Sequence, residues 1–170
     1  FLLVEAMMGL FDGAADGSGA PADLAVTLGL PIVFVVDCSR LSQSVAAMVK
    51  GYMDFRGDVH VAGVILNKVG SARHEAMLRG ALEASGIEIF GVLRADPALG
   101  LPERHLGLVQ AGEHGALASF IAHAAEIVSR NCALERLVAV AQTRAAQPFA
   151  PAASCLPPLG QRIAIARDRA

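Results

Sequence analysis

Polar side chains end three apolar runs of this sequence, and their chemical types suit ligand binding. Glu5 follows the run at the start of the chain, Asp37 closes PIVFVVD, and Asn67 closes VHVAGVILN. Each of these residues, taken alone, is explained equally well as a cap or a turn former. Parallel α/β sheets bind ligands at the carboxyl ends of their strands. Three polar residues on one such edge therefore favour a binding site there.

Two Arg-His pairs could hold an anionic ligand. Arg73 and His74 open a predicted helix, and Arg104 and His105 lie in a long predicted loop. Arginine grips a carboxylate through two parallel N–H bonds, so both pairs are candidates for binding a substrate or a phosphate. A role in pinning their own loops is as consistent with each pair. The histidines show no metal-ligand spacing.

The segment MGLFDG combines two glycines with a carboxylate. Gly9 and Gly13 could allow a ligand to approach the backbone closely, and Asp12 could orient a substrate, bind a metal or form a turn. Ser44 lies near the start of a predicted helix, whose N-terminus could bind an anion, or Ser could simply cap that helix. Four apolar residues could line the site or belong to the core: Met7, Met8, Leu10 and Phe11.

Strands and helices alternate along the chain and position these residues. Apolar runs predict strands over 1–5, 31–37, 59–67 and 87–93. Helical spacing and Pro or Gly boundaries predict helices over 21–29, 42–55, 72–85, 112–130 and 133–145, with a loop over 94–109. This alternation predicts an α/β fold with a doubly wound, mostly parallel sheet. Two helices and a linker follow the sheet.

Composition limits the function classes. The 170 residues are 54% hydrophobic and 18% charged, enough for one domain with a buried parallel sheet. A net charge of -2 without a basic block argues against nucleic acid as a partner. No apolar run reaches the roughly 20 residues of a membrane span. Three widely spaced cysteines are expected to be reduced thiols in a cytoplasmic protein.

Four segments in order resemble the cobyrinic acid and hydrogenobyrinic acid a,c-diamide synthases. The segments are VEAMMGLFDG (4–13), GVILNKVGSARH (63–74), LPERHLGLV (101–109) and IAIARD (163–168). The resemblance covers essentially the whole chain and implies a sheet of the P-loop NTPase or dethiobiotin synthetase-like type. It also implies a strand, a glycine-rich phosphate loop and a helix upstream of the matching residues, so that the chain on its own is expected to be inactive.

The family's reaction is the ATP-dependent amidation of two acetate carboxylates on a corrinoid, with ammonia from glutamine. The resemblance assigns Glu5 as the catalytic Mg²⁺ ligand, because hard carboxylate oxygens suit this cation. It places Asn67 against the adenine edge and leaves Gly9 and Gly13 beside the nucleotide. The six candidates for substrate binding are Asp12, Ser44, Arg73, His74, Arg104 and His105. A homodimer is also implied, although the sequence itself marks no interface.

The resemblance divides the chain into three parts. Residues 1–143 would be a partial synthetase domain, 144–160 a Pro- and Ala-rich linker, and 161–170 the first strand of a glutaminase domain. Three alternatives stay open: cobyric acid synthase, another ligase of the dethiobiotin synthetase-like fold, and a non-catalytic ATPase-like binding domain. RHLGLV and IAIARD argue against the ligase of the dethiobiotin synthetase-like fold, and the lack of a basic surface and the loop that resembles the corrinoid family argue against the ATPase-like domain.

Overall fold

The computed structural model describes residues 2–100, 103–104, 107–108 and 115–142. In chain order the elements are α1 (Pro21–Leu28), β1 (Ile32–Asp37), α2 (Ser44–Asp54), β2 (Val61–Val69), α3 (Ala72–Ala84), β3 (Ile89–Arg94), the 3-10 helix η1 (Pro97–Leu99), β4 (Glu103–Arg104), β5 (Gly107–Leu108), α4 (Leu117–Asn131) and α5 (Leu134–Gln142). The predicted linker and glutaminase strand, over 144–170, lie outside the described residues.

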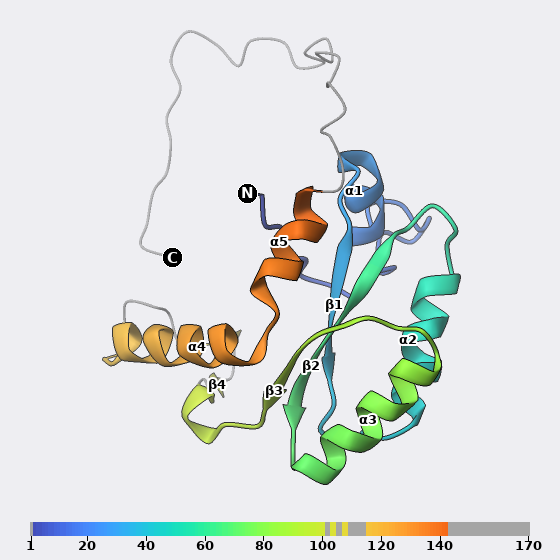
Figure 1. The fold of residues 1–170 in the computed structure, drawn as a ribbon. Helices are drawn as coiled ribbons and strands as arrows, with labels where there is room; N and C mark the ends of the chain where they lie inside the picture. Colours follow the sequence, from blue (N-terminus) through green and yellow to red (C-terminus); the bar gives the residue numbers. More distant parts are fainter. Residues whose placement is uncertain (1, 101–102, 105–106, 109–114, 143–170) are drawn as a thin grey trace, which may run out of the picture.

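The main sheet has three parallel strands in the order β1-β2-β3, and all three run downward in Figure 1. Each is joined to the next through a helix on the sheet, as parallel pairing requires. The predicted α/β class with a parallel sheet is confirmed. The predicted helices and the three later strands are confirmed as well, with ends that differ by a few residues.

One face of the sheet buries the main core against α2 and α3. Val36, Leu66 and Val92 from the strands meet Val49 of α2 and Leu78 of α3, and each of these is at most 5% exposed. Complete burial of one such side chain stabilises the fold by about 1.5–3 kcal/mol. This burial explains why the strand sequences are apolar runs. It also holds the carboxyl ends of the strands at fixed positions.

A second core forms at the amino ends of the strands. Leu10 and Ala22 pack there with Val59 and Val61. The helix α1 starts with Pro21, and the carboxylate of Asp23 accepts a hydrogen bond from the Ala20 N–H at 3.0 Å. This bond closes the helix start although no hydroxyl residue stands at the cap.

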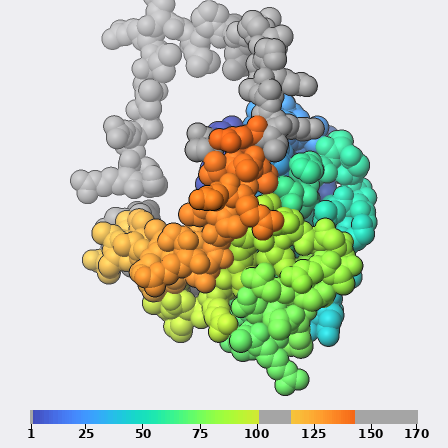
Figure 2. All heavy atoms as spheres, in the orientation of Figure 1, coloured from blue at the N-terminus to red at the C-terminus, as the bar shows by residue number. Residues whose placement is uncertain are grey.

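The connection between α4 and α5 crosses β3 closely. Cys132 forms an isolated bridge with Gly91, and the Ala133 N–H donates to the Phe90 carbonyl at 2.7 Å. A side chain at Gly91 would collide with the Cys132 sulfur, so only glycine permits this crossing. Figure 2 shows α4 and α5 in orange; α4 packs against β3 and η1, and α5 packs against β3.

Two predictions are wrong in part. Residues 2–5 form no strand, since no neighbouring strand among the described residues pairs with them, and Leu3 is 94% exposed. The predicted loop over 94–109 contains η1, which Asp96 caps through a 2.8 Å bond from the Ala98 N–H. It also contains the short antiparallel pair β4-β5.

Candidate functional site at the carboxyl edge of the sheet

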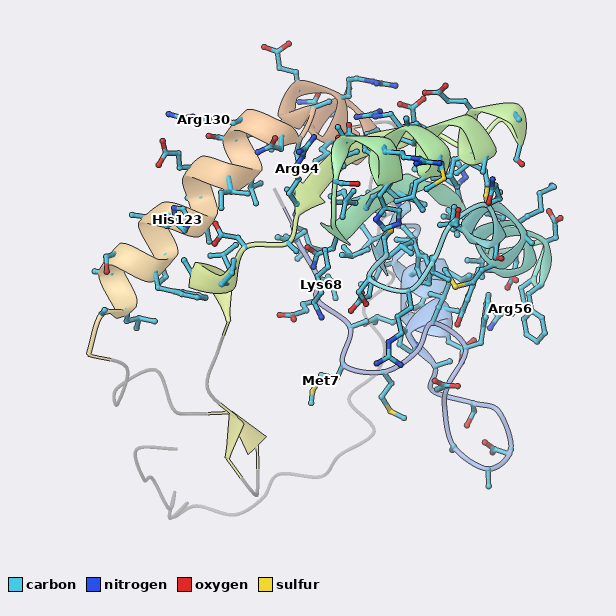
Figure 3. The ribbon with its side chains drawn as sticks, turned by 90° about the horizontal axis from the view of Figure 1, so that it is seen from below. Met7, Arg56, Lys68, Arg94, His123 and Arg130 are labelled. Carbon is cyan, nitrogen blue, oxygen red and sulfur yellow. The ribbon has the colours of Figure 1, made fainter. Side chains whose placement is uncertain are left out.

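The carboxyl ends of the three strands carry polar side chains at one edge. Asp37 of β1 pairs in register with Asn67 of β2, and Arg94 ends β3. Figure 3 views the molecule from below, toward this edge, with Lys68 and Arg94 labelled. The structure therefore brings Asp37 and Asn67 together as the sequence predicted. It does not place Glu5 on a strand beside them.

Asn67 stands where β2 departs from regular geometry. Its side-chain oxygen accepts a 2.9 Å hydrogen bond from the Lys68 N–H, and Lys68 has a left-handed φ of 57°. A left-handed conformation costs a residue other than glycine about 1–2 kcal/mol. The strand continues to Val69 beyond this point, so Asn67 lies inside a strand and not at its last residue.

Asp37 is held by two donors at the same edge. The Lys68 ammonium donates to one carboxylate oxygen at 2.7 Å, and the Ser39 N–H donates to the other at 3.0 Å. The hydrogen bond from Lys68, and next that from Ser39, hold the pKa of Asp37 well below its usual range. The carboxylate therefore stays ionised, and Lys68 bridges two strands while its side chain remains exposed.

His74 pins two loops with both ring nitrogens. Its Nδ1 accepts from the Gly70 N–H at 3.1 Å, and its Nε2 lies 2.7 Å from the Leu41 carbonyl oxygen. A carbonyl can only accept, so Nε2 must carry the proton. These contacts support the loop-pinning role for His74. Its neighbour Arg73 is exposed and remains a candidate for ligand binding.

The segment MGLFDG forms a tight turn. The Asp12 N–H donates to the Gly9 carbonyl at 3.0 Å, and a side chain at Gly9 would collide with the Asp12 carboxylate. A side chain at Gly13 would collide with the Ser18 carbonyl oxygen. Gly13 is thus required by the chain's own backbone, whereas the flexible Asp12 side chain can turn aside at Gly9, and ligand approach stays a candidate role for both glycines.

The apolar residues around this turn divide between two roles. Leu10 is 7% exposed in the second core, and the Phe11 ring stacks on Tyr52 with centroids 5.8 Å apart. Met7 and Met8 point outward, and Met7 is 98% exposed. The two methionines are therefore available to a ligand, and the half-buried Phe11 borders a hollow together with Tyr52 and Phe55.

Ser44 is the first residue of α2 and not its cap. The capping position belongs to Gln43, whose side chain makes no capping hydrogen bond. Ser44 is exposed, so it remains a candidate for contacting an anion. Arg104 lies in β4, and His105 lies outside the described residues. The structure does not test the roles proposed for this second Arg-His pair.

Sequence reasoning missed an ion-paired group beside β3. His123 of α4 lies 2.7 Å from the Asp96 carboxylate, and Arg94 reaches Glu75 of α3 at 3.4 Å. The Ala98 N–H and then His123 lower the pKa of Asp96. The pair spans 27 positions, and no local spacing marks such a contact. Of this group, Arg94 and Asp96 border a shallow hollow of about 250 Å³ together with Pro97.

Two exposed carboxylates fit a magnesium ion that a nucleotide also ligates. Glu5 and Asp12 are both exposed and supply hard oxygen atoms. Magnesium usually takes one or two carboxylates and completes its shell with water and phosphate oxygens. No group of three or more His, Cys, Asp or Glu residues gathers among the described residues, so a metal held by protein ligands alone is not indicated there.

Within the same residues, no helix is both long and apolar enough to cross a membrane.

A parallel sheet with a polar, ligand-accessible carboxyl edge defines the class of nucleotide-binding α/β domains. Sequence comparison agrees, since residues 8–109 match the family described as "CobQ/CobB/MinD/ParA nucleotide binding domain". The match covers more than half of the chain. The chain therefore belongs to this P-loop NTPase-like family.

The curated relatives are more specific. The chain is 63% identical over 169 residues to the hydrogenobyrinate a,c-diamide synthase of Rhizobium meliloti (strain 1021), across 98% of the chain and 38% of that relative. It is 57% identical over 173 residues to the synthase of the same name from Brucella anthropi, across 99% of the chain and 39% of that relative. The chain thus spans about two fifths of the length of these relatives. No solved structure matches it significantly.

Proposed function

We propose that this chain is the nucleotide-binding and corrinoid-facing part of an ATP-dependent amide synthase that acts on the corrinoid ring. The substrate would be hydrogenobyrinic acid, with its a and c acetate carboxylates as acceptors, and glutamine would supply the ammonia. The observation that carries the proposal is the 63% identity across 98% of the chain with a synthase of that name. Cobyrinic acid, which differs by its central metal, is the alternative acceptor.

The chemistry requires an activated carboxylate. ATP transfers its terminal phosphoryl group to an acetate oxygen, and ammonia then displaces phosphate from the acyl phosphate. In this reaction the protein mainly positions the reactants and offsets negative charge. Magnesium would supply part of that offset, with Glu5 as its protein ligand. Asp12 would orient the corrinoid or share the ion.

The residues at the carboxyl edge would divide the remaining work. Asn67 would read the purine edge, since an amide offers both a donor and an acceptor. Gly9 and Gly13 would shape the turn beside the phosphates. Arg73, Ser44 and the pair Arg104-His105 would bind the acidic side chains of the corrinoid. His74 would hold together the two loops that contain Gly70 and Leu41.

The domain arrangement is part of the proposal. Because the chain covers 38% of the relative from Rhizobium meliloti, we expect amidation to need the remainder of a longer protein. Residues 144–160 would link this domain to a glutaminase domain that begins within 161–170. The working enzyme would be a cytoplasmic homodimer.

The test is amidation by the complete protein that contains this chain. Hydrogenobyrinic acid, ATP, Mg²⁺ and glutamine are incubated together, and the corrinoid is followed by mass spectrometry. We expect monoamide and then diamide, with ATP consumed in proportion. Titration calorimetry of the 170-residue chain with Mg-ATP and with the corrinoid then shows which ligand these residues bind alone. Amidation of another carboxylic acid, with hydrogenobyrinic acid left unchanged, would contradict the proposal.

A further inference from the structure

Lys68 adopts a backbone conformation that lysine disfavours. Its φ is 57°, and it is the one residue other than glycine with positive φ among those the structure describes. A Cβ atom crowds the following carbonyl in this region, so glycine, and sometimes Asn or Asp, usually occupies it. A strained residue beside a candidate site is a reason to ask what the strain achieves.

The strain coincides with a bulge in β2. Leu66 pairs with Val92 and Val69 with Arg94, so two residues of β2 stand opposite one residue of β3. Bulges bend a strand and redirect side chains, and they occur often beside active sites. The two residues inside the bulge are Asn67 and Lys68. Burial of Lys68 does not explain the bulge, because its side chain is 58% exposed.

The bulge directs the Lys68 N–H back onto the preceding side chain. That N–H donates to the Asn67 Oδ1 at 2.9 Å. Asn67 Nδ2 has no hydrogen-bond partner among the described residues, and Asn67 is only half-buried. The bond therefore orients the amide with its two N–H donors free for a ligand atom that accepts.

The side chain of Lys68 holds this arrangement. Its ammonium lies 2.7 Å from Asp37 Oδ2 on the neighbouring strand, directly across from Asn67 in the register. An ion pair from β1 to a strained residue of β2 opposes relaxation of that residue to negative φ. The backbone N–H of Lys68 thus holds the Asn67 amide, and its ammonium holds Asp37, the register partner of Asn67.

We infer that Lys68 is a positioning residue, which orients the Asn67 amide so that Nδ2 donates to the N7 acceptor of a purine. This inference rests on the proposed nucleotide binding and deepens it. Asn67 would contact N7. The preference for a nucleotide that carries N7 would also depend on Lys68, which need not touch the nucleotide. A lysine at this position would otherwise be expected to act only through its charge.

The test compares ATP with 7-deaza-ATP, in which a carbon replaces N7. Affinities are measured by calorimetry on the complete protein that contains this chain. We expect wild type to prefer ATP roughly tenfold, as for one well-formed hydrogen bond. Lys68→Ala loses the ion pair but keeps the backbone penalty, so residue 68 relaxes and the preference falls to within about twofold. Lys68→Gly loses the same ion pair but adopts the left-handed conformation freely, so it keeps most of the preference.

Two control variants separate this role from the others. Asn67→Ala should abolish the preference, and Lys50→Ala, which removes another exposed Lys-Asp pair, should keep it. Equal loss in Lys68→Ala and Lys68→Gly would overturn the inference and show a role of charge alone. Wild type that binds both nucleotides equally would overturn it while nucleotide binding stands. Wild type that binds neither nucleotide would overturn the proposed function as well.

Discussion

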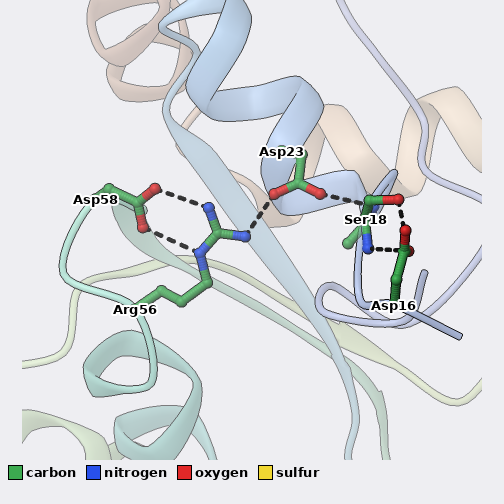
Figure 4. Close-up of polar contacts among 6 residues, drawn as sticks. Asp16, Ser18, Asp23, Arg56 and Asp58 are labelled. Atoms are coloured by element: carbon green, nitrogen blue, oxygen red, sulfur yellow. Dashed lines mark hydrogen bonds and ion pairs between the residues drawn. The ribbon is translucent and has the colours of Figure 1, made fainter. Parts of the chain in front are cut away.

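Each end of the sheet carries a basic side chain paired with Asp, and the two ends use this pairing in different ways. At the amino end, Arg56 donates to Asp23 at 2.6 Å and to both carboxylate oxygens of Asp58, at 2.7 and 3.0 Å (Figure 4). One planar guanidinium thereby ties α1 to the loop between α2 and β2. The backbone of Arg56 is unstrained, and its fork geometry suits two carboxylates.

At the carboxyl end, the Lys68-Asp37 pair joins two strands but accompanies a bulge and a left-handed residue. Half of the Asn67 amide is left without a partner among the described residues. The amino-end cluster lowers free energy locally, whereas the carboxyl edge retains strain and an unsatisfied donor. This difference supports the proposal that the carboxyl end serves a ligand, whereas the amino end stabilises the fold.

The largest effect should come from the core beneath the bulge. Leu66→Ala and Leu82→Ala each remove a fully buried side chain from the same cluster, so each should lower the free energy of unfolding by about 2–5 kcal/mol. Only Leu66 adjoins the bulge, so only Leu66→Ala should also reduce the preference for ATP over 7-deaza-ATP. Urea unfolding and calorimetry measure the two quantities. If Leu82→Ala also lost the preference for ATP over 7-deaza-ATP, the preference would not depend on the bulge at the carboxyl end, and the comparison between the two ends would fail.

The second effect concerns activity without stability. Glu5→Gln keeps the shape of an exposed side chain but removes its charge, so we expect amidation to fall by roughly 10–100-fold or more, as for a weakened metal site. The melting temperature should stay within error. Higher Mg²⁺ should recover part of the rate. Steady-state kinetics over a magnesium series measures this, and an unchanged rate would remove Glu5 from the site.

The third effect is the reverse, a change that lowers stability and leaves nucleotide binding unaltered. Arg56→Met keeps the length of the side chain but breaks the bonds to Asp23 and Asp58, so we expect the melting temperature to fall by a few degrees. Nucleotide affinity should not change. Lys50→Ala, at an exposed pair within α2, serves as the control and should leave the melting temperature nearly constant. Weaker ATP binding in Arg56→Met would show that the two ends are coupled.

The smallest effect is a pH dependence of the amino-end cluster. Arg56 lowers the pKa of both Asp23 and Asp58 from the ordinary value of 3.8. A depressed pKa in the folded state gives stability that is complete above the ordinary value and is lost as the pH falls below it. Thermal melts from pH 6 to pH 3 should therefore fall more steeply for wild type than for Arg56→Met. Parallel curves would show that the cluster adds little.

Sequence reasoning located most of the elements but not all of their consequences. Helices and the three later strands followed from apolar spacing and from Pro21 and Gly29, because these signals are local. The strand expected over residues 1–5 failed since pairing needs a neighbour that composition cannot supply. The apolar runs predict strand ends at Asp37 and Asn67; β2 continues to Val69, and the parallel register places the two residues side by side.

The sequence by itself determined the α/β class, the polar edge and the resemblance to the corrinoid diamide synthases, because periodicity and motifs are properties of neighbouring residues. Only the tertiary structure decided which groups are free. It turned Leu10 into the core and Met7 outward, and it joined both nitrogens of His74 to the backbone. It also placed Lys68 in a strained bulge. Each outcome depends on contacts between distant segments, and such contacts form only when the chain has packed.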